Sequence, residues 1–193
     1  MEAELLSLIA ARRGHFRLES GHHGNLWLDL DRLFLRPALL LPFARELAGR
    51  LSAHRVEAVV GPLSGGAFVS QMVATELDLH FAFAERRADV QGVTYGIPPP
   101  LHASLRGKTV AIVDDAINAG SATRATYAAL KALAARPVAV GALLILGETA
   151  SSFFEANNLA VESIARRPNE LWEPAACPMC AAGIELSSPA AAG

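Results

Sequence analysis

Hydrophobic positions in the first part of the chain recur at helical spacing in two segments. Residues 2–13 place apolar side chains three and four positions apart. Residues 37–54 repeat this pattern, with Pro37 at a position suited to the first turn of a helix. The spacing therefore predicts one helix over 2–13 and another over 37–54.

From residue 56 onward, short β-rich runs alternate with helix-like stretches. Strands are predicted over 56–61, 80–84, 109–114, 138–146 and 159–165, and helices over 66–78, 121–135 and 150–157. This alternation is typical of βαβ units, so the predicted fold class is α/β, with a mainly parallel sheet flanked by helices. In such sheets ligands bind beyond the carboxyl ends of the strands.

Composition narrows the class of partner. The chain has 193 residues, of which 52% are hydrophobic and 19% charged, enough for a sizeable core in a single domain. A formal charge of -2 and a pI near 6.3 provide no broad basic field, so a small molecule is expected and not a nucleic acid. The chain shows no signal-peptide pattern and no run of the ~18 apolar residues that a membrane helix needs. A cytoplasmic protein that does not bind membranes is expected.

The stretch TVAIVDDAINAGSATR, residues 109–124, combines two adjacent carboxylates with a loop of small residues. Asp114 and Asp115 follow the apolar strand, and a helix is predicted to begin near Ser121. The start of a helix offers unpaired N–H groups to an anion, and Gly120 lets the backbone approach it closely. Carboxylates repel phosphate, so their own partners would be sugar hydroxyls or a divalent cation. The combination indicates a ribose 5-phosphate; the alternative is that the two acids only cap a turn.

The strand, the acid pair and the loop closing in Gly-Ser together resemble the phosphoribosyl pyrophosphate (PRPP) signature of type I phosphoribosyltransferases. Among these enzymes the chain resembles orotate phosphoribosyltransferase. GPLSGGAF (61–68) is similar to the pyrophosphate loop of that branch, and FRLESGHHGNLWLDLDRL (16–33) resembles its N-terminal hood. The resemblance implies a Rossmann-like fold in one domain over 1–193, with a hood about 1–35, a core about 37–166 and a C-terminal extension about 168–193.

The resemblance also implies a role for each matching residue. Asp114 and Asp115 would hold the ribose hydroxyls and are the protein groups able to contact Mg²⁺, which would enter with PRPP. The 5-phosphate would be wrapped by Asn118, Ala119, Gly120, Ser121, Ala122 and Thr123. The pyrophosphate loop would comprise Leu63, Ser64, Gly65 and Gly66, and the base would meet Arg124 and Trp27. A homodimer that makes pyrimidine nucleotides from PRPP and a nucleobase is implied.

Simpler structural roles remain open for three of these features. Gly65 and Gly66 could merely turn the chain from a strand into a helix. Trp27 could belong to the core, and Arg124 could be an exposed arginine paired with Glu148.

The sequence departs from the orotate pattern in its positive charges. Glu19 stands where the hood of those enzymes carries a cation, and residues 85–107, which match their mobile loop, contain no lysine. Arg86 and Arg87 are left as the catalytic candidates, because departing pyrophosphate needs preorganised cations. Two functional classes follow: a transferase, or a PRPP- or nucleotide-binding regulatory protein with weak or no transferase activity.

The two cysteines of the chain, Cys177 and Cys180, have the spacing of zinc ligands. A structural zinc site needs four ligands, which a dimer could supply as two plus two. A buried corner or a redox-sensitive thiol pair is the favoured interpretation. His22 and His23 are expected to be exposed loop residues, without a third ligand nearby to make a metal site.

Overall fold

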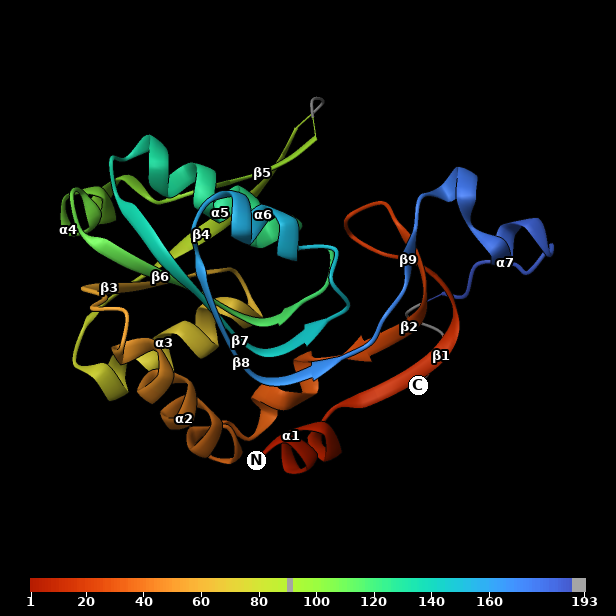
Figure 1. Ribbon diagram of the computed structural model, residues 1–193, viewed down its shortest axis with the longest axis horizontal. Coiled ribbons are helices and arrows are strands. Elements are labelled where there is room, and N and C mark those ends of the chain that lie inside the picture. The colour runs from red at the N-terminus through yellow and green to blue at the C-terminus, as the bar shows by residue number, and fades with distance from the viewer. Residues whose placement is uncertain (90–91, 189–193) are drawn as a thin grey trace.

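A computed structural model of the chain describes residues 1–89 and 92–188 (Figure 1). Its centre is a six-stranded sheet in the order β5-β4-β3-β6-β7-β8, in which β5 runs antiparallel to β4 and the remaining neighbours pair in parallel. The strands are β3 Ala58–Pro62, β4 His80–Asp89, β5 Gly92–Gly96, β6 Thr109–Ile117, β7 Arg136–Leu146 and β8 Ala160–Arg167. The predicted α/β class with a mostly parallel sheet is confirmed.

Helices cover both faces of this sheet (Figure 1). The helices α1 Glu2–Leu8, α2 Leu41–Ser52 and α3 Gly65–Leu77 pack on one face. The other face is covered by α4 His102–Leu105, α5 Ser121–Ala132 and α6 Ser151–Ala156. Short 3-10 turns lie at Asp31–Leu35, Pro37–Leu39, Pro99–Leu101 and Pro174–Ala176. Among the described residues, the helices are all too short or too polar to cross a membrane.

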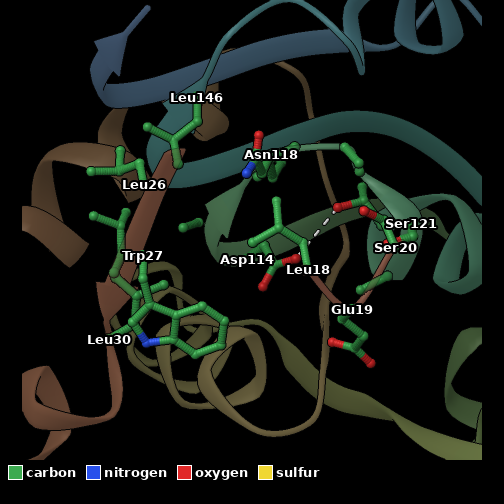
Figure 2. A pocket seen from close by; sticks show the side chains of 17 residues that line it. Leu18, Glu19, Ser20, Leu26, Trp27, Leu30, Asp114, Asn118, Ser121 and Leu146 are labelled. Carbon is green, nitrogen blue, oxygen red and sulfur yellow. Dashed lines mark hydrogen bonds between the residues drawn. The ribbon is translucent and has the colours of Figure 1, made fainter. Parts of the chain in front are cut away.

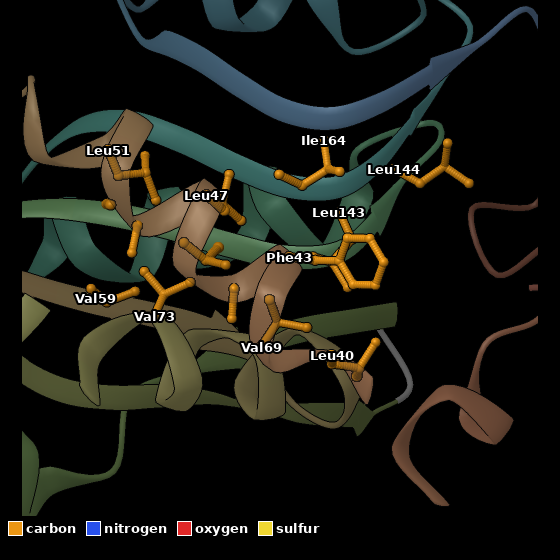
Figure 3. Packing of buried hydrophobic residues seen from close by; sticks show 14 of the residues in the cluster. Leu40, Phe43, Leu47, Leu51, Val59, Val69, Val73, Leu143, Leu144 and Ile164 are labelled. Carbon is orange, nitrogen blue, oxygen red and sulfur yellow. The ribbon is translucent and has the colours of Figure 1, made fainter. Parts of the chain in front are cut away.

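Two hydrophobic layers arise from the alternation of side chains along the central strands. Val59 and Val113 point to the layer under α2 and α3, while their neighbours Val60 and Ile112 point to the layer under α5. Figure 3 shows the first layer, where Leu47 and other α2 side chains meet those of β7 and α3. Because β3, β6 and β7 are buried on both faces, their sequences read as continuous apolar runs.

A second, smaller sheet forms the hood beside the core. It contains β1 Ala10–Arg17, β2 His23–Asp29 and the two-residue strand β9 Leu171–Trp172, all antiparallel in the order β1-β2-β9. The predicted helix over 2–13 is therefore wrong beyond Leu8. Ile9 is already extended, and the residues after it pair with β2, so that tertiary pairing overrides the helical apolar spacing.

The burial of the histidines in the hood also corrects the sequence analysis. His23, predicted to lie in an exposed loop, begins β2 and is only 6% exposed. His15 on β1 is buried as well, and both contact the segment that holds Cys177 and Cys180. The cause is the C-terminal extension, where α7 Pro178–Ala181 packs against the hood from a distant part of the sequence (Figure 1).

Candidate active site

The acid pair lies near the carboxyl end of β6, which continues to Ile117 and so ends later than predicted. The backbone N–H of Asp115 donates to Asp114 Oδ1 at 3.0 Å, and the Thr123 hydroxyl donates to Asp114 Oδ2 at 3.4 Å. The backbone N–H of Ala116 donates to Asp115 Oδ1 at 2.9 Å. Both carboxylates are thus oriented by donors from their own strand and from α5.

Burial raises the pKa of Asp114 well above its usual range, and the neighbouring Asp115 carboxylate adds to this effect. Burial raises the pKa of Asp115 too, although hydrogen bonds to its carboxylate oppose the rise. Two carboxyl groups in such a place resist ionising together. Ligands that donate hydrogen bonds or carry positive charge would relieve this cost, which makes the pair a candidate binding site.

The glycine loop lies directly against the acid pair. A methyl group built at Gly65 would overlap the Asp115 carboxylate, and one built at Gly66 would crowd Asp114 Oδ1. These glycines therefore have a packing role beyond turning the chain from β3 into α3. The peptide bond between Leu63 and Ser64 in the same loop is cis, and Leu63 is partly exposed.

A helix start lies on the other side of the acids. Gly120 precedes α5 with φ +75°, a conformation that glycine adopts without strain. The first N–H groups of a helix have no partner within the helix, so those of Ser121, Ala122 and Thr123 are available at this end of α5. Asn118 is held in the loop by Asn169, whose side-chain amide donates to Asn118 Oδ1 at 3.1 Å.

A cavity of about 240 Å³ lies between these core elements and the hood. The hood contributes Leu18, Glu19, Ser20, Leu26, Trp27, Leu28 and Leu30; the core contributes Asp114, Ala116, Ile117, Asn118, Ala119, Gly120, Ser121, Ala122, Thr123 and Leu146. Figure 2 shows Trp27 on the hood side of this space, with Asp114 and Asn118 on the core side. Trp27 is only half-buried and lines the cavity, so the interpretation of Trp27 as a core residue does not describe it fully.

The three candidate arginines are outside the described residues that line this cavity, and each has a partner. Arg86 Nε lies 2.7 Å from Glu19 Oε1, and Arg87 Nη2 lies 3.7 Å from Glu85 Oε2. Arg124 Cζ lies 5.9 Å from the centre of the Phe153 ring, and Arg124 is outside the set of described residues that line the cavity.

Glu148, the partner considered for Arg124, accepts instead from the Ser151 hydroxyl at 2.6 Å. The structure thus places the Asp, Asn, Gly, Ser, Ala and Thr candidates together, while the three arginines are outside the described residues that line the cavity.

Tyr95 is a neighbour of the site that the sequence analysis missed. It lies on β5 opposite Arg86, and burial together with the Glu19 and Asp114 carboxylates raises its pKa to about 12. The strand β5 was not predicted, because GVTYG is short and follows a run of charged residues. Its alternating Val93 and Tyr95 were the available signal for a strand.

The comparison with known families decides the classification. The phosphoribosyl transferase domain family matches residues 41–167, about two thirds of the chain. The chain belongs to this family. A curated orotate phosphoribosyltransferase from Thermotoga maritima is 31% identical over 186 residues, with 95% of this chain and 94% of the relative covered. Another curated orotate phosphoribosyltransferase, from Caldanaerobacter subterraneus, is 28% identical over 177 residues, with 92% of this chain and 88% of the relative covered.

Solved structures agree on the fold. The orotate phosphoribosyltransferase from Aeropyrum pernix superposes with a TM-score of 0.64 at 23% identity, covering 81% of this chain and 88% of the other. The adenine phosphoribosyltransferase from Thermoanaerobacter pseudethanolicus superposes with a TM-score of 0.67 at 16% identity, covering 86% of this chain and 99% of the other. At these identities the likeness concerns the fold alone. The chain is a phosphoribosyltransferase, and its family implies PRPP and a nucleobase as substrates.

Proposed function

We propose that this phosphoribosyltransferase transfers the phosphoribosyl group of Mg-PRPP to an orotate-type base in pyrimidine nucleotide synthesis. The observation that carries the proposal is the position of Trp27 across one cavity from Asp114 and the start of α5. A sugar-phosphate site and an aromatic surface for a planar base therefore share one space. The orotate phosphoribosyltransferases among the relatives, aligned over most of both chains, support the choice of base.

Each part of PRPP has a chemically matching surface. The 5-phosphate would accept hydrogen bonds from the N–H groups at the start of α5, where the helix dipole also favours an anion. The ribose hydroxyls would donate to Asp114 and Asp115. The pyrophosphate would lie beside the loop of Leu63, Ser64, Gly65 and Gly66, whose two glycines pack against the acid pair.

The acid pair also fits a magnesium ion. Two adjacent, buried carboxylates with raised pKa values offer the hard oxygen ligands that Mg²⁺ prefers, and a cation would relieve their mutual repulsion. Asp114 and Asp115 would therefore hold the ion together with PRPP. When bound, the ion would offset the negative charge that develops on departing pyrophosphate.

In the transfer step, the bond from ribose C1 to pyrophosphate breaks and its electron pair leaves with pyrophosphate, while a ring nitrogen of the base bonds to C1 and gives up its proton to solvent. The carboxylates near the ribose favour the positive charge that develops on the sugar. Arg86 is the side chain on β4 best placed to meet the departing pyrophosphate, because it is tied to Glu19 at the cavity wall. To act, its guanidinium has to exchange the Glu19 carboxylate for phosphate oxygens.

A second candidate is a PRPP- or nucleotide-binding regulatory protein of the same fold, with weak or no transferase activity. The observation that favours it is the pairing of both Arg86 and Arg87 with carboxylates. The two lysines of the chain do not compensate, since Lys108 precedes β6 at the opposite end of that strand and Lys131 lies in the last turn of α5. We therefore expect PRPP to bind while transfer to orotate is slow.

The test combines two measurements on the same protein. Calorimetry with Mg-PRPP measures binding, and pyrophosphate release with orotate, uracil or adenine measures transfer. Binding with slow release that is greatest for orotate supports the proposal. Turnover with orotate in the usual enzyme range of ~1–10³ s⁻¹ would show that the paired arginines do not limit the reaction. Preference for adenine would replace the proposed base, and failure to bind PRPP would refute the site.

A further inference from the structure

Four side chains with metal-ligating atoms converge outside the active site. His15 and His23 come from the hood strands β1 and β2, and Cys177 and Cys180 come from the C-terminal extension. One nitrogen or sulfur atom of each lies within 4.8 Å of the other three. His15, His23 and Cys177 are buried, while Cys180 is exposed. Segments about 150 residues apart in the sequence thus meet with their ligand atoms directed to one point.

Four of the six separations between the ligand atoms lie near the edge lengths of a metal-centred tetrahedron. His15 Nε2 lies 3.0 Å from His23 Nδ1 and 3.4 Å from Cys177 Sγ. Cys180 Sγ lies 3.7 Å from His15 Nε2 and 3.3 Å from His23 Nδ1. Tetrahedral zinc with Zn–N near 2.0–2.1 Å and Zn–S near 2.3 Å places its ligand atoms roughly 3.3–3.8 Å apart. The two histidine nitrogens lie closer together than this range, so zinc binding requires them to move apart.

The surrounding hydrogen bonds orient the cluster. His15 Nδ1 lies 2.7 Å from the carbonyl oxygen of Ile184, which can only accept, so Nδ1 carries the proton and Nε2 presents its lone pair to the cluster. A backbone acceptor behind a ligating histidine is the usual outer support of a zinc site. The turn after the cysteines supplies it, because Gly183 with φ +70° lets the chain reverse and Ile184 N–H bond back to Met179.

We propose that His15, His23, Cys177 and Cys180 bind one zinc ion per chain as a structural site. Two thiolates and two imidazoles in a tetrahedral arrangement are a ligand set for zinc, and four protein ligands leave no position open for a substrate. The site is complete within one chain, which differs from the two-plus-two arrangement across a dimer considered from the cysteines alone.

The location of the cluster indicates what a bound metal would stabilise. His15 and His23 flank the turn whose Leu18, Glu19 and Ser20 line the active-site cavity. The hood sheet is small, and β9 contributes only two residues to it. Small units with little core are commonly fastened by a metal or a disulfide. The zinc would fix the turn end of the hood hairpin to the C-terminal extension and so hold that wall of the cavity in place.

The first experiment measures metal content in the full-length protein. We expect protein supplied with zinc to retain one ion per chain after gel filtration, and cobalt-substituted protein to show thiolate charge-transfer and tetrahedral d–d absorption. Cys177→Ser and His23→Ala should lose the bound ion, while His22→Ala, which changes the adjacent histidine, should retain it. His22 is a matched control because its ring contacts Ser20 and Glu173, outside the cluster.

The wild-type measurements keep the test decisive even if a cluster variant fails to fold. A protein that retains no zinc, or that binds cobalt without thiolate bands, would overturn the proposal and leave a metal-free hydrogen-bonded cluster or a thiol pair. One ion per two chains would also overturn it, in favour of a site shared between copies. As a second readout, removing zinc by a chelator should abolish hydrogen-exchange protection in residues 15–29 and 171–184 while leaving β6 and β7 protected.

Discussion

The guanidinium of Arg86 and the carboxylate of Glu19 lie 2.7 Å apart and connect β4 to the turn between β1 and β2. Glu19 lines the candidate active-site cavity, so Arg86, the cation that we propose for pyrophosphate, is held by an acid at the cavity wall. Both side chains are about half exposed, so their pairing contributes little to stability, within about 1 kcal/mol. Its main effect is on which anion the guanidinium binds.

Replacing that acid should increase catalysis. In Glu19→Gln, we expect Arg86 to be free for the substrate, with kcat for pyrophosphate release rising about tenfold or more and the melting temperature nearly unchanged. Glu85→Gln is the matched control, because it removes the acid near Arg87, whose separation of 3.7 Å is longer. An equal rise in both variants would mean that the effect is not specific to Arg86, and that release of Arg87 or the change in net charge acts as well. No rise in Glu19→Gln would exclude release of Arg86 as the limiting factor.

Asp114 should make stability depend on pH. Because its folded pKa is raised, the native protein keeps a proton that the unfolded chain has already released above a pKa of about 3.9. The free energy of unfolding therefore falls as pH rises from that value through the raised folded pKa. Asp114→Asn removes this loss, so the variant should be more stable than the parent near pH 7, by about 0.5–2 kcal/mol, and the difference should shrink toward pH 4.

Thermal unfolding over a pH series checks this expectation, and calorimetry with Mg-PRPP on the same samples checks the cost to function. The single side-chain oxygen of Asn can still accept from the Asp115 N–H, and its NH2 group can donate to the Thr123 hydroxyl oxygen in place of the bond that Asp114 accepts there, so the fold should persist. A pH-independent difference in stability would show that the acid is not strained in the free protein. Unchanged PRPP affinity in Asp114→Asn with Asp115→Asn would end the assignment of the acid pair to the ligand.

The sequence predicted the elements and loops that are determined by residues close together along the chain. Alternating apolar strands and helices predicted the parallel sheet, and the small residues after Asp115 predicted a close-approach loop at its carboxyl edge. The packing of Gly65 and Gly66 against the acids depends on how β3 and β6 lie side by side. No spacing within one segment specifies that contact.

The errors fall where distant segments meet. Residues 10–13 have helical apolar spacing but pair with β2, and His23 is buried by a segment that begins about 150 residues later. The cysteine pair was recognised, but its histidine partners could not be found by counting ligands near it in the sequence. Such contacts depend on the closure of a long loop, which leaves no local periodic signal.

An apolar surface at the edge of the core predicts a homodimer. Leu35 is 76% exposed and Phe68 45%, and Leu39 and Leu41 are exposed as well, which is unusual for large apolar side chains. Phe34, Leu41 and Phe68 line one hollow in this surface. We expect a two-fold dimer in which a second copy covers it.

Light scattering at micromolar concentration should give the mass of two chains for the parent and of one chain for Phe68→Asp. Leu186→Asp changes an exposed leucine of the C-terminal extension instead and should remain dimeric. A monomeric parent would refute the dimer. A dimeric Phe68→Asp would move the interface to another surface.

Arg124 should recognise the base, although in the free protein it lies over Phe153. A cation in the first turn of α5 opposes the helix dipole, which favours acids there, so its presence suggests a ligand. Contact with the Phe153 ring at 5.9 Å contributes about 0.5–1 kcal/mol at an exposed site, which leaves the guanidinium free to swing toward a carboxylate. A planar guanidinium suits the carboxylate of orotate through two parallel hydrogen bonds.

For Arg124→Ala we expect KM for orotate to rise about 10- to 100-fold, equivalent to losing a charge-assisted contact of roughly 1.5–3 kcal/mol, with KM for PRPP changed little. Arg124→Lys should fall between the two, because it keeps the charge and loses the paired geometry. Arg136→Ala, at an exposed arginine that begins β7, is the control and should leave both constants unchanged. A lower melting temperature in Arg124→Ala with unaltered KM for orotate would assign Arg124 to packing on Phe153, and base recognition would then rest on Trp27 and the hood.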